Sequence, residues 1–438
     1  MKRLRKPAGR RPARASTAPK DWAFHAPNSA VLEALAGRRY QASLREHFGE
    51  RTFEELSVLA RAAKKVRREY RAPVLVVPGM MGSRLSDLGP RGRAARMIWI
   101  DPKRIGTGRL EDLKLPSSKT IRARGVLLPA YAKLKLELAL QGFDARFFAY
   151  DWRLSLVEIG AALARAIAAS RPVSVIAHSM GALAARVAAR QLPKRTLRRL
   201  IMLGAPNRGS YAPVLALRGV YPFVQKLSRL DLRHSPEQLS AGIFSTFPGL
   251  YQMLPVPPHT DLDFDLLDAA CWPGKGPRPD PELLARVPAA RAGMADPDER
   301  MVQIVGVNRE TVVAVRRTPR GFEYGSSPNG DGTVPVSMAL LPGLETYYVD
   351  ELHGNLTSNS RIIGAIADLI RDGRTRALEP RFTPKEGPLR RVSDAQLRGA
   401  ELGKVDWRYL TSVQREAVMT ELDGAAAEGA PDSASSLA

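Results

Sequence analysis

Short apolar runs and longer amphipathic stretches alternate along most of this chain. Apolar runs typical of buried strands occur at residues 73–78, 144–150, 173–178, 200–203, 301–307 and 345–349. Stretches with helical spacing lie at residues 128–141, 155–170, 180–191 and 356–371. Strands that alternate with helices favour a mostly parallel sheet flanked by helices. The pattern therefore predicts an α/β fold.

The alternation stops at an insertion over residues 211–299. This segment is rich in proline and large apolar residues, and residues 238–260 contain no Asp, Glu, Lys or Arg. Four prolines interrupt that stretch, so an unbroken apolar helix of about twenty residues cannot form. We predict a cap, or lid, whose apolar residues contact acyl chains. The candidates are Phe247, Leu250, Tyr251 and Met253. The same residues could instead form the ordinary core of a small cap.

One motif predicts a reactive serine. Ala177-His178-Ser179-Met180-Gly181 follows a strand-like run and precedes a helix of small residues. At a sharp turn from strand to helix, small neighbours let the turn close, and the helix N-terminus favours developing negative charge. Ser179 is thus the candidate nucleophile. The motif departs from Gly-x-Ser-x-Gly at Ala177, and a serine that only caps the next helix is the alternative.

A serine nucleophile needs a base, and the chain has six histidines. In hydrolases with a serine at such a turn, the chain order is nucleophile, acid, histidine. Only His234, His259 and His353 follow Ser179. His353 comes directly after the run at residues 345–349 and before an apolar helix, whereas His259 lies in a proline-rich stretch with no strand before it. His353 is therefore the candidate base.

The acid should lie between the serine and the histidine, in a loop. Asp331 fits, because Gly330 and Gly332 flank it and permit tight turns. An isolated Gly-Asp-Gly is more often a turn whose aspartate binds its own backbone. Together with Ser179 and His353, the catalytic interpretation is favoured.

An oxyanion hole requires two backbone N–H groups, one after the nucleophile and one from the turn after an early strand. The apolar run at residues 73–78 ends in Pro78-Gly79. By position, we assign the two donors to the amides of Met80 and Met180.

With these motifs in order, the chain resembles the lecithin:cholesterol acyltransferase and lysosomal phospholipase A2 group of α/β-hydrolases. The resemblance covers roughly residues 72–370 and is carried by Val77-Pro78-Gly79-Met80-Met81-Gly82-Ser83, Ile98-Trp99-Ile100-Asp101, Tyr150-Asp151-Trp152-Arg153-Leu154, Ala177-His178-Ser179-Met180-Gly181, Leu203-Gly204-Ala205-Pro206-Asn207-Arg208-Gly209-Ser210, Gly330-Asp331-Gly332-Thr333-Val334 and His353-Gly354-Asn355-Leu356. It implies the same three catalytic residues. It also implies lipid acyl esters as the substrate class and places Trp99 near the lipid entrance.

The assigned nucleophile, base, acid and oxyanion donors predict a reaction through an acyl-enzyme, which water or an alcohol then resolves. Water makes the protein a lipase or phospholipase, and an alcohol makes it an O-acyltransferase. The sequence does not decide between these two outcomes. A generic esterase of small esters is a further alternative.

Charge is the second global feature. The formal net charge is +23, and the first twenty residues carry eight Lys or Arg and no acid. Such a field favours peripheral contact with an anionic membrane. No DNA- or RNA-binding motif accompanies the charge, which argues against nucleic acid as a partner. Two alternatives stay open. The chain could be a non-catalytic membrane- or nucleic-acid-binding protein on this fold, or its positive charge could reflect only a composition rich in arginine.

The domain order predicted from these features has three parts. Residues 1–70 are a basic arm with helices, residues 71–372 are the catalytic domain with its cap, and residues 373–438 are a helical tail whose end, 424–438, is disordered. Cys271 is the only cysteine, so no intramolecular disulfide can form, and the N-terminus lacks a secretory pattern. We expect a cytoplasmic protein. We expect no cofactor, because metal-ligand and dinucleotide motifs are absent from the sequence.

Overall fold

The computed structural model describes residues 21–66, 72–88, 96–170, 172–257, 262–385, 387–399, 403–410 and 414. Its centre is a six-stranded sheet in which all neighbouring strands are parallel, in the order β11-β8-β7-β6-β1-β5. The strands are β1 (Ala72–Val77), β5 (Phe143–Phe147), β6 (Val173–His178), β7 (Leu197–Leu203), β8 (Met301–Gly306) and β11 (Glu345–Val349). The predicted parallel sheet is confirmed.

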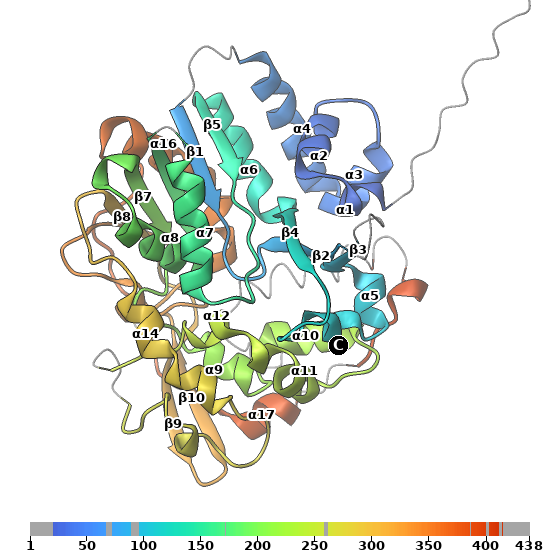
Figure 1. Cartoon of the computed structure of the whole chain (residues 1–438), viewed down its shortest axis with the longest axis vertical. Helices are drawn as coiled ribbons and strands as arrows, with labels where there is room; N and C mark the ends of the chain where they lie inside the picture. Colours follow the sequence, from blue (N-terminus) through green and yellow to red (C-terminus); the bar gives the residue numbers. More distant parts are fainter. Residues whose placement is uncertain are drawn as a thin grey trace, which may run out of the picture.

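Helices cover both faces of this sheet (Figure 1). Helices α7 (Leu156–Ala168) and α8 (Met180–Gln191) pack on one face, and α6 (Leu128–Leu140) and α16 (Ser360–Asp372) pack on the other. Side chains of a strand alternate between the faces. The α/β-hydrolase fold expected from the sequence is the fold observed.

Four helices precede the sheet: α1 (Trp22–His25), α2 (Asn28–Leu35), α3 (Gln41–Phe48) and α4 (Glu50–Lys65). They lie beside α6, and their apolar side chains share the core on that side of the sheet (Figure 1). Leu44 and Phe53, for example, are buried in the same cluster as Val74 of β1. The predicted basic arm, residues 1–20, lies outside the described residues.

The predicted cap follows β7 and ends before β8. It consists of short helices: α9 (Ala212–Leu217), α10 (Pro222–Leu230), α11 (Pro236–Gly242), α12 (Pro248–Tyr251), α13 (Pro281–Ala285) and α14 (Val287–Ala292). All six have a proline at their first or second position, which is suited to the first helical turn. In the described ranges, no helix is long and apolar enough to cross a membrane. His259 lies outside the described residues.

Two small antiparallel sheets accompany the central one. The first joins β3 (Arg96–Trp99), β2 (Ser83–Asp87) and β4 (Ile121–Val126), and the second joins β12 (Arg390–Ser393), β10 (Gly321–Ser327) and β9 (Thr311–Thr318). Strand β12 corrects the expectation of a purely helical tail, because these residues pair with β10. Only α17 (Asp394–Gly399) and a short turn of helix follow β12 among the described residues. The predicted disordered end, 424–438, lies outside them.

A buried ion pair joins the C-terminal segment, which contains β12 and α17, to the cap. Arg218, at the end of α9, donates to Asp394 of α17 at 2.8 Å, and both side chains are fully buried. The Tyr324 hydroxyl donates to the other oxygen of Asp394 at 2.7 Å. The cap, the β9–β10 hairpin and the C-terminal segment thus pack together (Figure 1).

Candidate active site

Ser179 occupies a strained turn between β6 and α8. Its φ of 53° and ψ of −127° are rare for a residue other than glycine. The turn approaches neighbouring loops so closely that a Cβ on Gly181 would lie 2.3 Å from the Pro78 carbonyl oxygen. A Cβ on Gly79 would lie 3.0 Å from the Cβ of Ser179. Glycine is therefore required two residues after the serine, as the sequence pattern indicated, and also at Gly79 in the facing loop.

His353 and Asp331 form a buried pair. His353 Nδ1 lies 2.7 Å from Asp331 Oδ2, and both side chains are almost inaccessible to solvent. The other carboxylate oxygen, Oδ1, accepts the backbone N–H groups of Thr333 at 3.0 Å and Val334 at 2.7 Å. Because the carboxylate can only accept, Nδ1 carries the proton, which leaves Nε2 as the basic nitrogen of the ring.

The hairpin β9–β10 separates Asp331 from β8 in sequence, yet the chain returns to that strand. The Arg309 N–H, before the hairpin, donates to the Gly330 carbonyl, after the hairpin, at 2.9 Å. The two ends of the hairpin therefore lie side by side. A Cβ on Gly306, the last residue of β8, would lie 2.6 Å from the Cβ of Asp331. The acid therefore sits at the carboxyl end of β8, while His353 follows β11.

Gly204, directly after β7, is packed against this pair. It has a φ of +54°, and a Cβ there would lie 2.9 Å from His353 Nδ1 and 3.0 Å from Asp331 Oδ2. In the sequence, Gly204 is marked only as part of the motif at residues 203–210. Its role as a spacer against the histidine and aspartate appears only in three dimensions.

The oxyanion hole was assigned by position to the N–H groups of two residues, and that assignment stays a prediction. Met180 is the first residue of α8, and Met80 is in the loop after β1. The Gly82 N–H donates to the Gly79 carbonyl at 3.1 Å, which tightens that loop. Helix α8 has twelve residues, and its N-terminal N–H groups favour negative charge at Ser179.

A buried hydrogen-bond network joins the loop after β1 to the serine turn. The Gly79 N–H donates to Tyr131 Oη at 2.9 Å, and Tyr131 Oη lies 3.0 Å from His178 Nδ1. His178 Nε2 lies 3.1 Å from the carbonyl oxygen of His353. A carbonyl only accepts, so Nε2 carries the proton and Tyr131 donates to Nδ1. Burial, then the nearby His353, lowers the pKa of His178 to about 3, so its ring is neutral.

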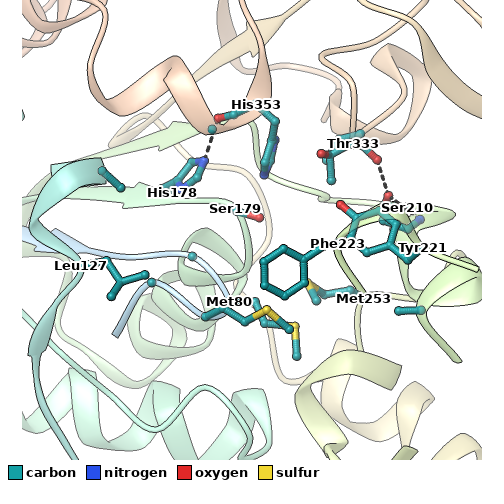
Figure 2. Close-up of a pocket in the computed structure, with 18 of the residues that line it drawn as sticks. Met80, Leu127, His178, Ser179, Ser210, Tyr221, Phe223, Met253, Thr333 and His353 are labelled. Atoms are coloured by element: carbon teal, nitrogen blue, oxygen red, sulfur yellow. Dashed lines mark hydrogen bonds between the residues drawn. The ribbon is translucent and has the colours of Figure 1, made fainter. Parts of the chain in front are cut away.

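A cavity of about 450 Å³ opens beside Ser179 and His353. Figure 2 shows both side chains facing it, with the His353 ring directed towards Ser179. Its wall includes residues of the N-terminal helices, of the loop after β1 and of the cap. Apolar surface comes from Phe48, Met80, Trp99, Phe223, Phe244, Leu250 and Met253. Polar groups come from Thr52, Ser210, Tyr221, Thr333, Asn355 and Ser358. Among the described residues, none of those that line the cavity is Asp, Glu, Lys or Arg.

The predicted substrate contacts divide into two groups. Trp99, Leu250 and Met253 line the cavity. Phe247 and Tyr251 do not, which corrects the expectation for them. Phe247 is fully buried and packs edge-on against Trp152, and the Tyr251 hydroxyl donates to the Ser245 carbonyl at 2.8 Å. Both side chains are fully buried and belong to the core of the cap.

The aromatic motif at residues 150–153 is structural in this fold. The Tyr150 hydroxyl donates to the Pro78 carbonyl at 2.7 Å, and the Trp152 indole N–H donates to the Ser83 carbonyl at 3.0 Å. Arg153 makes a two-pronged pair with Asp151, at 2.9 and 2.6 Å. The motif thus supports the loop after β1, which carries Met80. In the described part of the chain, no group of three or more His, Cys, Asp or Glu could hold a metal ion.

The chain thus combines an α/β-hydrolase sheet with a serine turn and a buried histidine–aspartate pair. No family model and no curated protein matches its sequence. Solved structures that are similar include a Tle4–Tli4 complex, at 12% identity and a TM-score of 0.47, over 69% of this chain and 98% of the other. A mature lipase BlEst2 from Bacillus licheniformis has 15% identity and a TM-score of 0.33, over 68% and 92% of the two chains. These likenesses identify no family and no activity.

Proposed function

We propose that this protein is a serine-dependent hydrolase or acyltransferase that acts on lipid acyl esters. The observation that carries the proposal is the buried His353–Asp331 pair, whose basic nitrogen faces the same apolar cavity as Ser179. A nucleophile, a base within the same site and an orienting acid are what acyl transfer through a covalent intermediate requires.

The proposed reaction begins with proton transfer from Ser179 Oγ to His353 Nε2 as Oγ bonds to the ester carbonyl carbon. The carbonyl oxygen becomes an oxyanion, which the N–H groups of Met80 and Met180 stabilise. The bond to the leaving alcohol then breaks, and the alcohol takes the proton from His353. Asp331 stays ionised throughout and holds the ring in the required tautomer.

The acyl-enzyme is resolved by the reverse sequence. His353 takes a proton from water or from an alcohol, whose oxygen attacks the acyl carbon and releases Ser179. Water yields a fatty acid, as in a phospholipase A, and an alcohol yields a new ester, as in a lecithin:cholesterol acyltransferase. The cavity supports a lipid acyl group as substrate because apolar side chains dominate its wall.

Contact with an anionic membrane is part of the proposal. The formal charge of +23 favours it, and each basic residue near an acidic surface contributes on the order of 1 kcal/mol. Such contact would bring the protein to its substrate without a membrane-spanning segment.

The experiment that tests the function compares esters of one alcohol whose acyl chains lengthen from two to about sixteen carbons. Wild-type protein should turn them over with kcat/KM that rises with chain length, and Ser179→Ala should not. Adding an alcohol acceptor, with free acid and new ester measured together, separates hydrolysis from transfer. Wild-type turnover that persists in Ser179→Ala would contradict the proposal, and a preference for acetyl esters would contradict the lipid substrate.

A further inference from the structure

The cavity extends to both sides of Ser179. Figure 2 shows Leu127 on one side of the serine and Phe223 of the cap on the other. Leu127 directly precedes α6, which packs on α4 and on the short helical turn η5 (His353–Thr357). The residues that α3 and α4 contribute to the cavity therefore lie on the side of Leu127, opposite the cap. Figure 1 shows the same order, with the N-terminal helices above and the cap helices below the small sheet of β2, β3 and β4.

The two sides differ in exposure. Phe223, Phe244 and Leu250, on the cap side, are apolar and buried. On the side of the N-terminal helices, Asn355 is exposed and Thr52 is partly exposed. This side therefore reaches solvent and suits the alcohol part of an ester, whereas the buried cap side suits an acyl chain.

The position of His353 supports the same assignment. In the proposed reaction the leaving alcohol takes its proton from His353, so the alcohol oxygen lies next to this ring. Asn355 and Ser358 follow the histidine, within and directly after η5, and both line the cavity. The Thr357 hydroxyl donates to the Ala130 carbonyl at 2.8 Å and so joins η5 to α6. An alcohol group that extends from the histidine along η5 therefore meets the wall formed by the N-terminal helices.

Phe48 and Thr52 form this wall from the two arms of a fixed corner. Phe48 ends α3, Thr52 lies in the first turn of α4, and Gly49 stands between the helices. The φ of +74° and ψ of 158° at Gly49 are a combination that is essentially limited to glycine. Arg45 pairs with Glu50 across the corner at 2.7 Å. The backbone thus determines where both side chains enter the cavity.

We propose that Phe48 and Thr52 are specificity-determining residues that limit the bulk of the alcohol, both as leaving group and as acceptor. The Phe48 ring is buried, and it packs edge-on against His47 with 4.7 Å between the ring centroids, so it cannot turn aside freely. Both residues precede residues 72–370, so the family resemblance does not imply this wall. The inference rests on the proposed function.

The test uses octanoate esters of three primary alcohols of growing bulk: ethanol, cyclohexylmethanol and adamantylmethanol. The measured quantity is kcat/KM for each bulky ester divided by kcat/KM for the ethyl ester. Phe48→Ala should raise this ratio about tenfold over wild type, because a pocket wall typically discriminates by at least this factor. Thr52→Phe adds bulk at a partly exposed position and should lower the ratio.

Leu44→Ala is the matched control. Leu44 is fully buried in α3, the helix that carries Phe48, but it does not line the cavity. It should therefore destabilise the protein and leave the ratio unchanged. In a second measurement, ethyl esters of acids of increasing length should show the same length profile in Phe48→Ala as in wild type.

An unchanged ratio in Phe48→Ala would overturn the inference, as would an equal change in Leu44→Ala. If Phe48→Ala does not fold, an unchanged ratio in Thr52→Phe has the same meaning. A shifted acyl-length profile in place of a shifted ratio would show that the N-terminal helices form the acyl side, which also contradicts the inference. Labelling of Ser179 by a fluorophosphonate separates these results from failure of the function. Labelling with turnover of the ethyl ester and no change of ratio rejects only the inference, whereas no labelling and no turnover reject the proposed function and the inference with it.

Discussion

The Tyr131 hydroxyl donates to Nδ1 of His178 at 3.0 Å, and the same oxygen accepts the N–H of Gly79 at 2.9 Å. One phenol on helix α6 thus joins the residue before the nucleophile to the residue before Met80. It fixes the distance between the serine and one proposed oxyanion donor. In this account, Tyr131 is a positioning residue that acts through the two loops it connects.

Tyr131→Phe should therefore lower kcat about tenfold and change KM little, because the oxyanion donor matters most in the transition state. It should also lower stability, since the Gly79 N–H and His178 Nδ1 both lose a buried partner. Steady-state kinetics and thermal unfolding check this. Tyr324→Phe is the matched control, because it also removes a buried phenol hydrogen bond, to Asp394, but lies outside the residues that line the cavity. Equal effects of the two variants on kcat would show that Tyr131 has only a structural role.

Asp331→Asn should reduce kcat by roughly four orders of magnitude, as in other triads. The amide oxygen can still accept the N–H groups of Thr333 and Val334, so the amide nitrogen must face His353 Nδ1. A donor there forces the proton onto Nε2, and the ring can no longer accept the proton of Ser179. Kinetics on protein with an unchanged circular dichroism spectrum measure the effect. A correctly folded variant with wild-type kcat would show that Asp331 is not the acid.

Gly204→Ala should abolish most of the activity. The added methyl group would lie 2.9 Å from His353 Nδ1 and would push the ring away from Asp331 or from Ser179. Gly343→Ala is the control, because Gly343 also has a positive φ, +81°, but a Cβ there meets nothing within 4 Å. Both variants should lose about 1 kcal/mol of stability from backbone strain. Only Gly204→Ala should lose turnover, and retained turnover there would contradict the geometry described for the pair.

Stability should fall as the pH is lowered from about 6.5 towards 3. Burial, then Arg84, lowers the pKa of His47 to about 3, and burial, then His353, lowers that of His178 to about 3. Each histidine is protonated in the unfolded chain below about 6.5 but stays neutral in the folded protein. Each therefore contributes stability that is full above 6.5 and is lost as the pH falls, by about 1.4 kcal/mol per pH unit.

The measurement is the free energy of unfolding between pH 7 and pH 5, in wild type, His178→Gln and His47→Gln. Each substitution should make the pH dependence shallower by about one proton. Only His178→Gln should also reduce turnover, because His178 belongs to the network beside the nucleophile. An unchanged slope in both variants would contradict the burial of neutral rings.

The sequence predicted the central sheet well, because each parallel strand is a buried apolar run with a clear boundary. It did not reveal the hairpin of β9 and β10, because exposed Arg316 and Arg317 interrupt the apolar pattern of β9. Strand β12 was missed for a related reason. Its sequence, Arg390–Ser393, is mostly charged or polar, and pairing with β10 rather than local preference makes it a strand.

The residues of the candidate site also divide into those that the sequence predicts and those that it does not. Ser179, Asp331 and His353 carry local signals: a strand–turn–helix motif, flanking glycines and a position after a strand. Tyr131 carries none, since it lies in an ordinary helix and reaches His178 only through the fold. Likewise, the contribution of Phe48 to the cavity wall could not be predicted from the sequence, because it depends on how α3 packs on α4 and how α4 packs on α6.

The most direct test of the central claim is intact-protein mass spectrometry after reaction with a lipid-like fluorophosphonate, in the presence of vesicles or detergent. An activated serine displaces fluoride, so the account predicts a single phosphonate adduct that maps to Ser179. The adduct should be absent in Ser179→Ala. No adduct on folded wild-type protein, or an adduct that persists in Ser179→Ala, would contradict the assignment of Ser179 as an activated nucleophile.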